Sequence, residues 1–225
     1  GGRAGAPATA GQHRAAGYVL HGIKLTAKDG ELLVVCGRVG SGKTTLASAI
    51  LGLLRASEGT RVLVTGSTAY VPQQAFVMNA TVRENILFGA PMDEDRYAAV
   101  LSACALEADL ATLPDGDDTE IGERGITISG GQRQRIAIAR AAYSDADLVI
   151  LDDPLSAMDP HVGQIVFDRC LCGLMAAKTR VFCTNQLQFA SAGKRVCFLD
   201  GGRIVEEGAF EELCAKEGGQ FASLY

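Results

Sequence analysis

Apolar residues along this 225-residue chain recur with two different periods, one typical of strands and one typical of helices. From residue 18 to 71 the pattern predicts strands around a single helix. The strands are predicted within 18–36 and at 61–64 and 68–71, and the helix at 45–54. Residues 1–17 are rich in Gly and Ala and have no apolar period, so they are predicted to be a flexible linker.

From about residue 75 to 144 the pattern becomes helical, and after that it alternates again between strands and helices. The predicted helices lie at 82–88, 93–104, 131–143, 160–174 and 210–216, the last closing the chain, and the later strands at 148–151, 180–184, 195–199 and 203–206. This order predicts an α/β core interrupted by a mostly helical lobe.

The junction between the strand ending at Cys36 and the next helix carries the most specific motif, GRVGSGKTT at residues 37–45. Glycines let backbone N–H groups of such a loop turn onto a β-phosphate, and the helix N-terminus adds the positive end of its dipole. Lys43 can reach the β- and γ-phosphate oxygens, and the Thr44 hydroxyl can bind Mg²⁺. The motif therefore predicts binding of a nucleoside triphosphate.

Composition narrows the classes of function further. A net charge of −5, without a basic patch interleaved with aromatic residues, gives no reason to expect a nucleic-acid partner. Apolar runs are shorter than the 18 or so residues needed to cross a bilayer, so any membrane role is expected to come through a partner segment. The seven cysteines include no C-x2-C pair, which favours reduced thiols over a zinc site.

Two further motifs lie downstream. The apolar strand 148–151 ends in Asp152 and Asp153. Asp152 could hold Mg²⁺ and Asp153 could polarise an attacking water, although a strand running into an Asp-Pro turn would look the same. The sequence ISGGQ at 128–132 precedes a helix, where Ser129 and the two glycines could bind a second anion or form a plain N-cap.

These motifs and their order resemble the nucleotide-binding domain of ATP-binding cassette (ABC) transporters, from about residue 18 to 225. GRVGSGKTT resembles the Walker A loop, Gln73 in YVPQQ the Q-loop glutamine, ISGGQ the LSGGQ signature, LVILDD Walker B, and SAMD at 156–159 the D-loop. Residues 81–89 and 119–125 are similar to the exporter branch, and in particular to the first such domain of the C subfamily, the multidrug-resistance-associated type.

The resemblance implies a P-loop NTPase (RecA-like) core of the α/β class, with an antiparallel β subdomain and an inserted α-helical subdomain at about 75–144. It implies ATP and Mg²⁺ as cofactors, a second nucleotide-binding domain bound head to tail, and transmembrane domains that hold the chain at the cytoplasmic face of a membrane. The nucleotide-binding residues that it implies are Gly37, Gly40, Ser41, Gly42, Lys43, Thr44, Thr45, Ser129, Gly130, Gly131 and Gln132. The metal ligands would be Thr44, Gln73 and Asp152, and the catalytic residues Asp153, Gln73 and Asn185.

The chain departs from the family pattern at three positions. Asp153 stands where the family has a catalytic glutamate, and Asn185 stands where it has a histidine. The aromatic residue expected to stack on adenine would fall near Gln12, and Tyr18 is the nearest substitute. These departures predict that this chain holds ATP but hydrolyses it weakly, while its signature residues complete the partner's site.

Two alternatives remain open. The chain could be a degenerate regulatory module that binds ATP mainly to stabilise a dimer, as Asp153 and Asn185 suggest. A soluble ABC ATPase acting on ribosomes or DNA is less favoured, since such proteins usually carry two cassettes or long coiled coils. Without a membrane segment, the chain is expected to be a fragment or a half that assembles with other chains.

Overall fold

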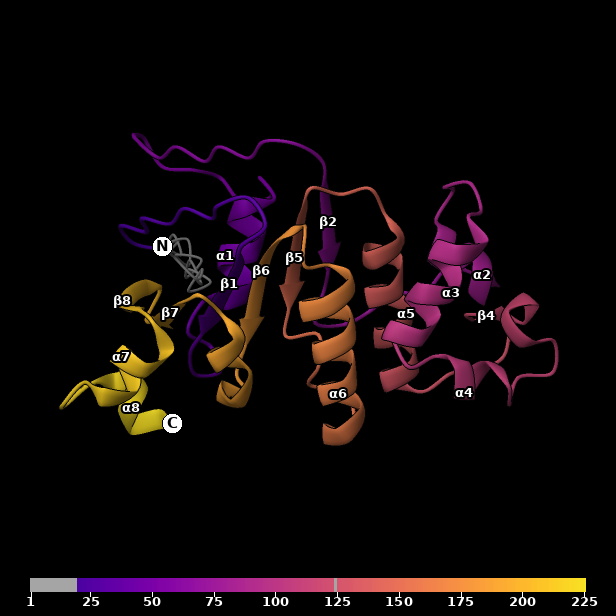
Figure 1. The fold of residues 1–225 in the computed structure, drawn as a ribbon. Coiled ribbons are helices and arrows are strands. Elements are labelled where there is room, and N and C mark those ends of the chain that lie inside the picture. The colour runs from indigo at the N-terminus through magenta and orange to yellow at the C-terminus, as the bar shows by residue number, and fades with distance from the viewer. Residues whose placement is uncertain (1–19, 124) are drawn as a thin grey trace, which may run out of the picture.

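A six-stranded, mostly parallel sheet forms the centre of the computed structural model, which describes residues 20–123 and 125–225 (Figure 1). The predicted linker at 1–17 and Tyr18 lie outside the described residues. The strand order is β2-β5-β6-β1-β7-β8, and only β8 runs antiparallel to its neighbour. The strands are β1 Leu32–Cys36, β2 Thr68–Val71, β5 Leu148–Asp152, β6 Thr179–Thr184, β7 Arg195–Asp200 and β8 Arg203–Gly208.

Helices cover both faces of this sheet, which is why β1 and β5 consist of buried residues without a polar face. Alternate residues of β1 belong to different cores. Leu33 and Val35 pack in the cluster that contains Leu46 of α1 (Lys43–Ile50), whereas Leu32 and Val34 pack in the larger cluster. The larger cluster also includes α6 (Pro160–Val166) and the π-helix η2 (Phe167–Leu174).

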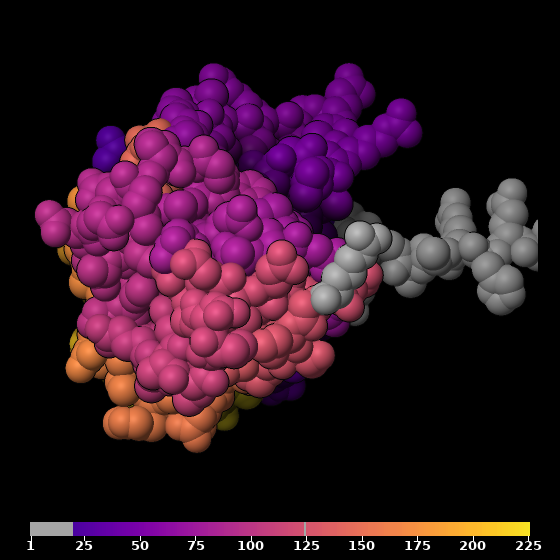
Figure 2. All heavy atoms as spheres, turned by 90° about the vertical axis from the view of Figure 1, so that its right-hand side faces the viewer, coloured from indigo at the N-terminus to yellow at the C-terminus, as the bar shows by residue number. Residues whose placement is uncertain are grey.

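Further helices gather beyond β2 and β5, on the right of Figure 1, and Figure 2 views the molecule from that side. They are α2 Val82–Leu87, α3 Glu94–Ala103, α4 Glu107–Leu110 and α5 Gly130–Tyr143, with the 3₁₀-helix η1 Gly116–Asp118 and the two-stranded antiparallel sheet β3 Ala80–Thr81 and β4 Glu120–Ile121. Thr81 and Ser129 each form a capping box at the start of α2 and α5. We refer to this group, 80–143, as the helical lobe.

The remaining elements follow β6 and β8. They are the 3₁₀-helix η3 Leu187–Ala192, α7 Phe210–Ala215 and α8 Gln220–Leu224. The helix predicted at 210–216 is therefore not the last element, because α8 follows it. Among the described residues, no helix is long and apolar enough to cross a membrane.

The α/β class is confirmed, with a small antiparallel sheet, β3–β4, beside the main one, where β8 also pairs antiparallel with β7. Of the stretch predicted to hold strands at 18–36, the described residues form a strand only at Leu32–Cys36. The strand predicted at 61–64 is wrong, because these residues form none. Leu63 is 72% exposed, as a strand-like sequence can be when no neighbouring strand supplies hydrogen bonds and packing. Helix α1 also ends earlier than predicted, at Ile50, because Gly52 follows with φ +72° and favours a helix end.

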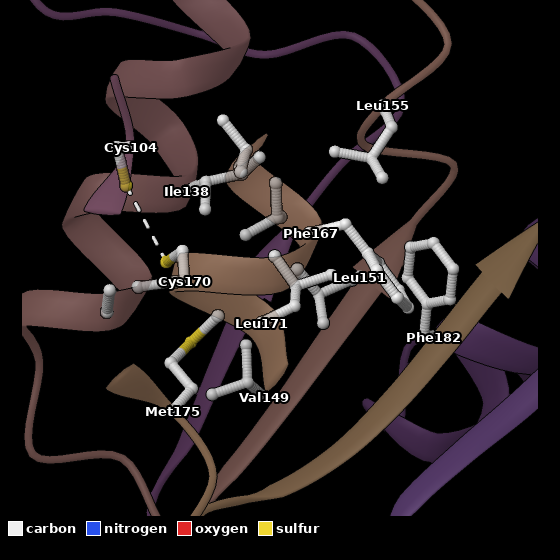
Figure 3. Packing of buried hydrophobic residues seen from close by; sticks show 14 of the residues in the cluster. Cys104, Ile138, Val149, Leu151, Leu155, Phe167, Cys170, Leu171, Met175 and Phe182 are labelled. Atoms are coloured by element: carbon white, nitrogen blue, oxygen red, sulfur yellow. Dashed lines mark hydrogen bonds between the residues drawn. The ribbon is translucent and has the colours of Figure 1, made fainter. Parts of the chain in front are cut away.

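Figure 3 shows how η2 packs against the sheet, with Leu171 and Met175 lying near Val149 and Leu151 of β5. Phe167 contacts Phe182 of β6 with ring centroids 5.5 Å apart. This contact between η2 and the sheet buries large apolar side chains, so it should contribute strongly to stability.

We expect Leu171→Ala to lower the free energy of unfolding by about 2–5 kcal/mol, because Leu171 is fully buried and its truncation leaves a cavity. The matched control is Leu63→Ala, expected to change stability by less than about 0.5 kcal/mol because Leu63 is exposed. Urea unfolding of both variants would measure the difference. An equal loss in the two variants would mean that residues 61–64 are packed like a buried strand.

Candidate functional site

The loop after β1 meets the start of α1 at the carboxyl ends of the parallel strands. Gly40 and Gly42 have φ of +81° and +109°, a region that residues with a side chain rarely adopt. A side chain at Gly37 would collide with the backbone carbonyl oxygen of Leu199. Ser41 carbonyl oxygen accepts a hydrogen bond from the Gly202 N–H at 3.0 Å, which anchors the loop to the turn after β7. The glycines therefore make this tight loop possible.

Lys43 is buried at the first position of α1. Its Nζ donates hydrogen bonds to the carbonyl oxygens of Gly37 at 2.8 Å and Arg38 at 2.9 Å. Burial lowers the pKa of Lys43, while the nearby carboxylates of Asp153 and Asp152 raise it in part. The ammonium group therefore lies against the loop, where an anionic ligand of the loop would contact it.

Asp152 ends β5 beside this loop and is buried. Its Oδ2 accepts a hydrogen bond from the Tyr70 hydroxyl at 3.4 Å. Burial raises the pKa of Asp152, and hydrogen bonding by the Thr44 side chain partly opposes the rise. Burial together with the Asp152 carboxylate raises the pKa of Tyr70 to about 12. Asp152 and Thr44 thus bring two side-chain oxygens together in the lining of the cleft.

Asp153 follows β5 with a left-handed backbone, φ +49°, which is uncommon for a residue with a side chain. Its N–H donates to the Cys183 carbonyl oxygen at 2.8 Å. Its Oδ2 accepts from Asn185 Nδ2 at 3.2 Å, and its Oδ1 accepts from Thr184 Oγ1 at 3.5 Å. Two of the three positions where the chain departs from the family pattern, Asp153 and Asn185, are therefore in direct contact.

A cleft of about 290 Å³ brings most of the predicted residues together. It is lined by Val39, Gly40, Gly42, Lys43, Thr44, Thr45, Gln73, Asp152, Asp153 and Asn185. Gly37 lines a neighbouring shallow groove, which Asn185 also lines. Three buried side-chain oxygens among the described residues lack a hydrogen-bond partner, and two of them, Ser41 Oγ and Asn185 Oδ1, belong to this region, whereas the third is the Tyr97 hydroxyl in the helical lobe. Polar atoms of this kind fit a site that takes a polar ligand.

The sequence motifs did not indicate every residue of the site. The motif gives Val39 no role beyond filling the loop, yet Val39 lines the cleft and is 87% exposed. Thr184 was also missed, although it contacts the Asp153 carboxylate. Parallel pairing of β5 with β6 places Asp152 opposite Cys183, so the residues just after Cys183 must lie near Asp153. Parallel pairing of the predicted strands 148–151 and 180–184 would therefore have indicated Thr184.

The predicted residues Ser129, Gly130, Gly131 and Gln132 lie apart from the cleft, at the start of α5 in the helical lobe. Ser129 Oγ accepts from the Gln132 N–H at 3.2 Å, and Gln132 Nε2 donates to Asp109 at 2.8 Å. Ser129 and Gly130 are exposed, and a side chain at Gly131 would come within 3.2 Å of the Ala157 carbonyl oxygen. This helix start therefore faces solvent and not the cleft of its own chain.

The chain matches known proteins over most of its length. Residues 20–156 match the family described as ABC transporter. ABC transporter C family member 12 of Dictyostelium discoideum is 49% identical over 207 residues, which is 92% of this chain and 16% of that protein. ATP-binding cassette sub-family C member 3 of Rattus norvegicus is 50% identical over 201 residues, 88% of this chain and 13% of that protein.

Sub-family C member 2 of Rattus norvegicus is 48% identical over 201 residues, again 13% of the relative's length. The chain thus spans only a small part of the curated relatives that it matches. The matched part contains the loop at 37–45, the signature at 128–132 and the acidic end of β5. The chain therefore belongs to the ABC transporter family and is an ATP-binding domain of the C-family type.

Proposed function

We propose that this chain binds Mg-ATP in the cleft at 37–45 and hydrolyses it weakly, as one of two nucleotide-binding domains that drive transport across a membrane. The observation that carries the proposal is the meeting of Lys43, Thr44, Asp152 and the Asp153–Asn185 pair in one cleft. These residues come from three separate parts of the chain, and the cleft places a cation, oxygen ligands and a carboxylate around one space.

In this proposal the loop N–H groups and Lys43 hold the phosphates, and Gly37, Gly40, Ser41, Gly42 and Thr45 belong to the same cradle. Thr44, Asp152 and Gln73 would hold Mg²⁺, which supplies charge neutralisation on the phosphates. No group of three or more His, Cys, Asp or Glu side chains in the described part of the chain could hold a metal alone. This fits Mg²⁺, which commonly uses one or two carboxylates together with substrate phosphates and water.

Weak hydrolysis follows from the surroundings of Asp153. Its carboxylate is one methylene shorter than that of glutamate, and misplacement of about 1 Å can cost roughly a hundredfold in rate. Both carboxylate oxygens also accept hydrogen bonds, from Asn185 and Thr184. Asn185 cannot take up a proton near neutral pH, unlike a histidine. Together these features leave the chain without a strong general base.

The exposed helix start at Ser129 supports the second part of the proposal. Because this segment lies outside its own cleft, it can meet a nucleotide only on another molecule or domain. We therefore propose head-to-tail pairing with a second nucleotide-binding domain, whose site Ser129, Gly130, Gly131 and Gln132 would complete. Transmembrane domains would hold the pair at the cytoplasmic face of a membrane. Direct contact between Asp153 and Asn185 also favours the alternative of a mainly regulatory ATP-binding module.

Lys43→Ala should weaken Mg-ATP binding by roughly 10- to 100-fold, because a charge-assisted contact to the phosphates is lost. Lys194→Ala is the matched control, since Lys194 is exposed and does not line the cleft. Isothermal titration calorimetry with ATP would compare both variants with the parent chain. Equal affinity in all three proteins would contradict binding in this cleft.

Asp153→Glu combined with Asn185→His should raise ATP turnover by about tenfold or more, because it restores a longer carboxylate and a titrating side chain. Turnover is measured at high protein concentration, with ATP binding confirmed in each protein. Since the two residues are in contact, the effects of the two single substitutions on ATP turnover should not sum to the effect of the double substitution. If the parent chain already hydrolyses ATP at the rate expected of the double variant, the proposal of weak hydrolysis is wrong.

Ser129→Arg should abolish ATP hydrolysis at the partner's site in an assembled transporter while ATP binding to this chain stays unchanged. The bulky side chain would block the exposed helix start at the interface that we propose. Ser57→Arg, in the exposed loop after α1, provides a control with the same change of charge and size. If Ser129→Arg leaves partner-site turnover at the control level, the signature segment does not complete that site.

A further inference from the structure

Two buried cysteines meet where the helical lobe contacts the core. Cys104 caps the C-terminus of α3, and Cys170 lies in the π-helix η2. The two Sγ atoms are 3.6 Å apart, and one thiol hydrogen-bonds to the other. Figure 3 shows this contact as a dashed line between the two side chains, at the upper left of the view. Both side chains are fully buried.

Apolar packing alone explains most buried cysteines, and Cys36, Cys183 and Cys197 fit that explanation. The 104–170 pair differs, because its sulfur atoms face each other across 66 residues of sequence. No other pair of cysteine sulfurs in the described part of the chain is hydrogen-bonded, and no metal-binding group includes them there. The pair therefore has the arrangement of a dithiol and not of a metal site.

We propose that Cys104 and Cys170 are a modification site at which mild oxidation forms an intrachain disulfide between α3 and η2. A disulfide needs the sulfurs about 2.05 Å apart, so they must approach by roughly 1.5 Å. Cys170 lies on a π-helical segment, where the backbone already departs from the regular helix, and such segments recur at functional sites. A small rearrangement of η2 would complete the bond.

Hydrogen peroxide is a suitable oxidant, because it is small and uncharged. One thiol is first oxidised to a sulfenic acid with release of one water. The second thiol then attacks that sulfur, the S–S bond forms, and a second water leaves. In total, two protons and two electrons pass from the two thiols to the peroxide. A dithiol reductant would reverse the reaction by exchange.

The reaction should be slow in the folded protein. The contact with Cys170 and burial raise the pKa of Cys104, so little of the reactive thiolate is present at neutral pH. Oxidation should therefore accelerate as pH rises, and it should need a transient opening between α3 and η2.

The disulfide would fix the helical lobe on the core. Helix α3 also packs against α5, through the edge contact of Tyr97 with Tyr143 at 6.2 Å between ring centroids. A bond at Cys104 therefore restrains the element that carries Ser129. Formation of the disulfide does not depend on the proposed function, whereas any effect on ATP turnover does.

The test is peptide mapping without reduction, on the 225-residue chain treated with hydrogen peroxide and then alkylated. The expected product joins the tryptic peptides that contain Cys104 and Cys170, lighter by two hydrogen atoms. Cys172 lies in the same tryptic peptide as Cys170, so Cys172→Ser is the matched control and should keep the cross-link. Cys104→Ala and Cys170→Ala should each lose it.

A second readout is thermal unfolding. The cross-linked chain should unfold at a temperature about 5 °C or more above that of the reduced chain, because a long loop is closed in the unfolded state. Dithiothreitol should remove the increase. A cross-link to Cys172 instead of Cys170, oxidation to sulfinic acid without a cross-link, or cross-linking only after unfolding in urea would each overturn the proposal.

Discussion

The register of three parallel strands, β1, β5 and β6, brings the loop at 37–45, the two acids and Asn185 together. Pairing of β1 with β6 sets Cys36 opposite Thr184, and pairing of β5 with β6 sets Asp152 opposite Cys183. The residues that follow these strands must therefore meet at one edge of the sheet. A shift of one residue would move the side chains to the opposite faces and separate the acids from the loop at 37–45.

Burial strengthens the electrostatic interactions at this edge of the sheet. Lys43, Asp152 and Asp153 are all buried, and opposite charges in such a setting interact more strongly than they would in water. The pKa of Lys43 falls with burial and that of Asp152 rises, so each charged form is costly alone and is stabilised by its neighbours. A site of this kind holds strong charges close together before any ligand arrives.

Much of this arrangement could be predicted from the sequence, because buried parallel strands are continuous apolar runs and a glycine-rich loop between strand and helix has few other uses. The contact between Asp153 and Asn185 could not be, since it arises from strand pairing and not from spacing along the chain. The strand predicted at 61–64 is wrong for a related reason, because a strand-like sequence forms a strand only where a neighbouring strand pairs with it. The π-helix that contains Cys170 could not be predicted either, because its apolar residues do not recur with a period that distinguishes it from an ordinary helix.

The exposed apolar residues before β2 have a consequence for the chain in solution. Val62 and Val64 have high strand propensity. Together with Leu63 they are exposed and precede β2, which lies at the edge of the sheet. Unpaired edges with apolar neighbours are templates for another strand, and the shortness of β2 limits this only in part. Solubility at high concentration and resistance to unfolding therefore depend on different residues, so a chain that is stable against heat can still self-associate.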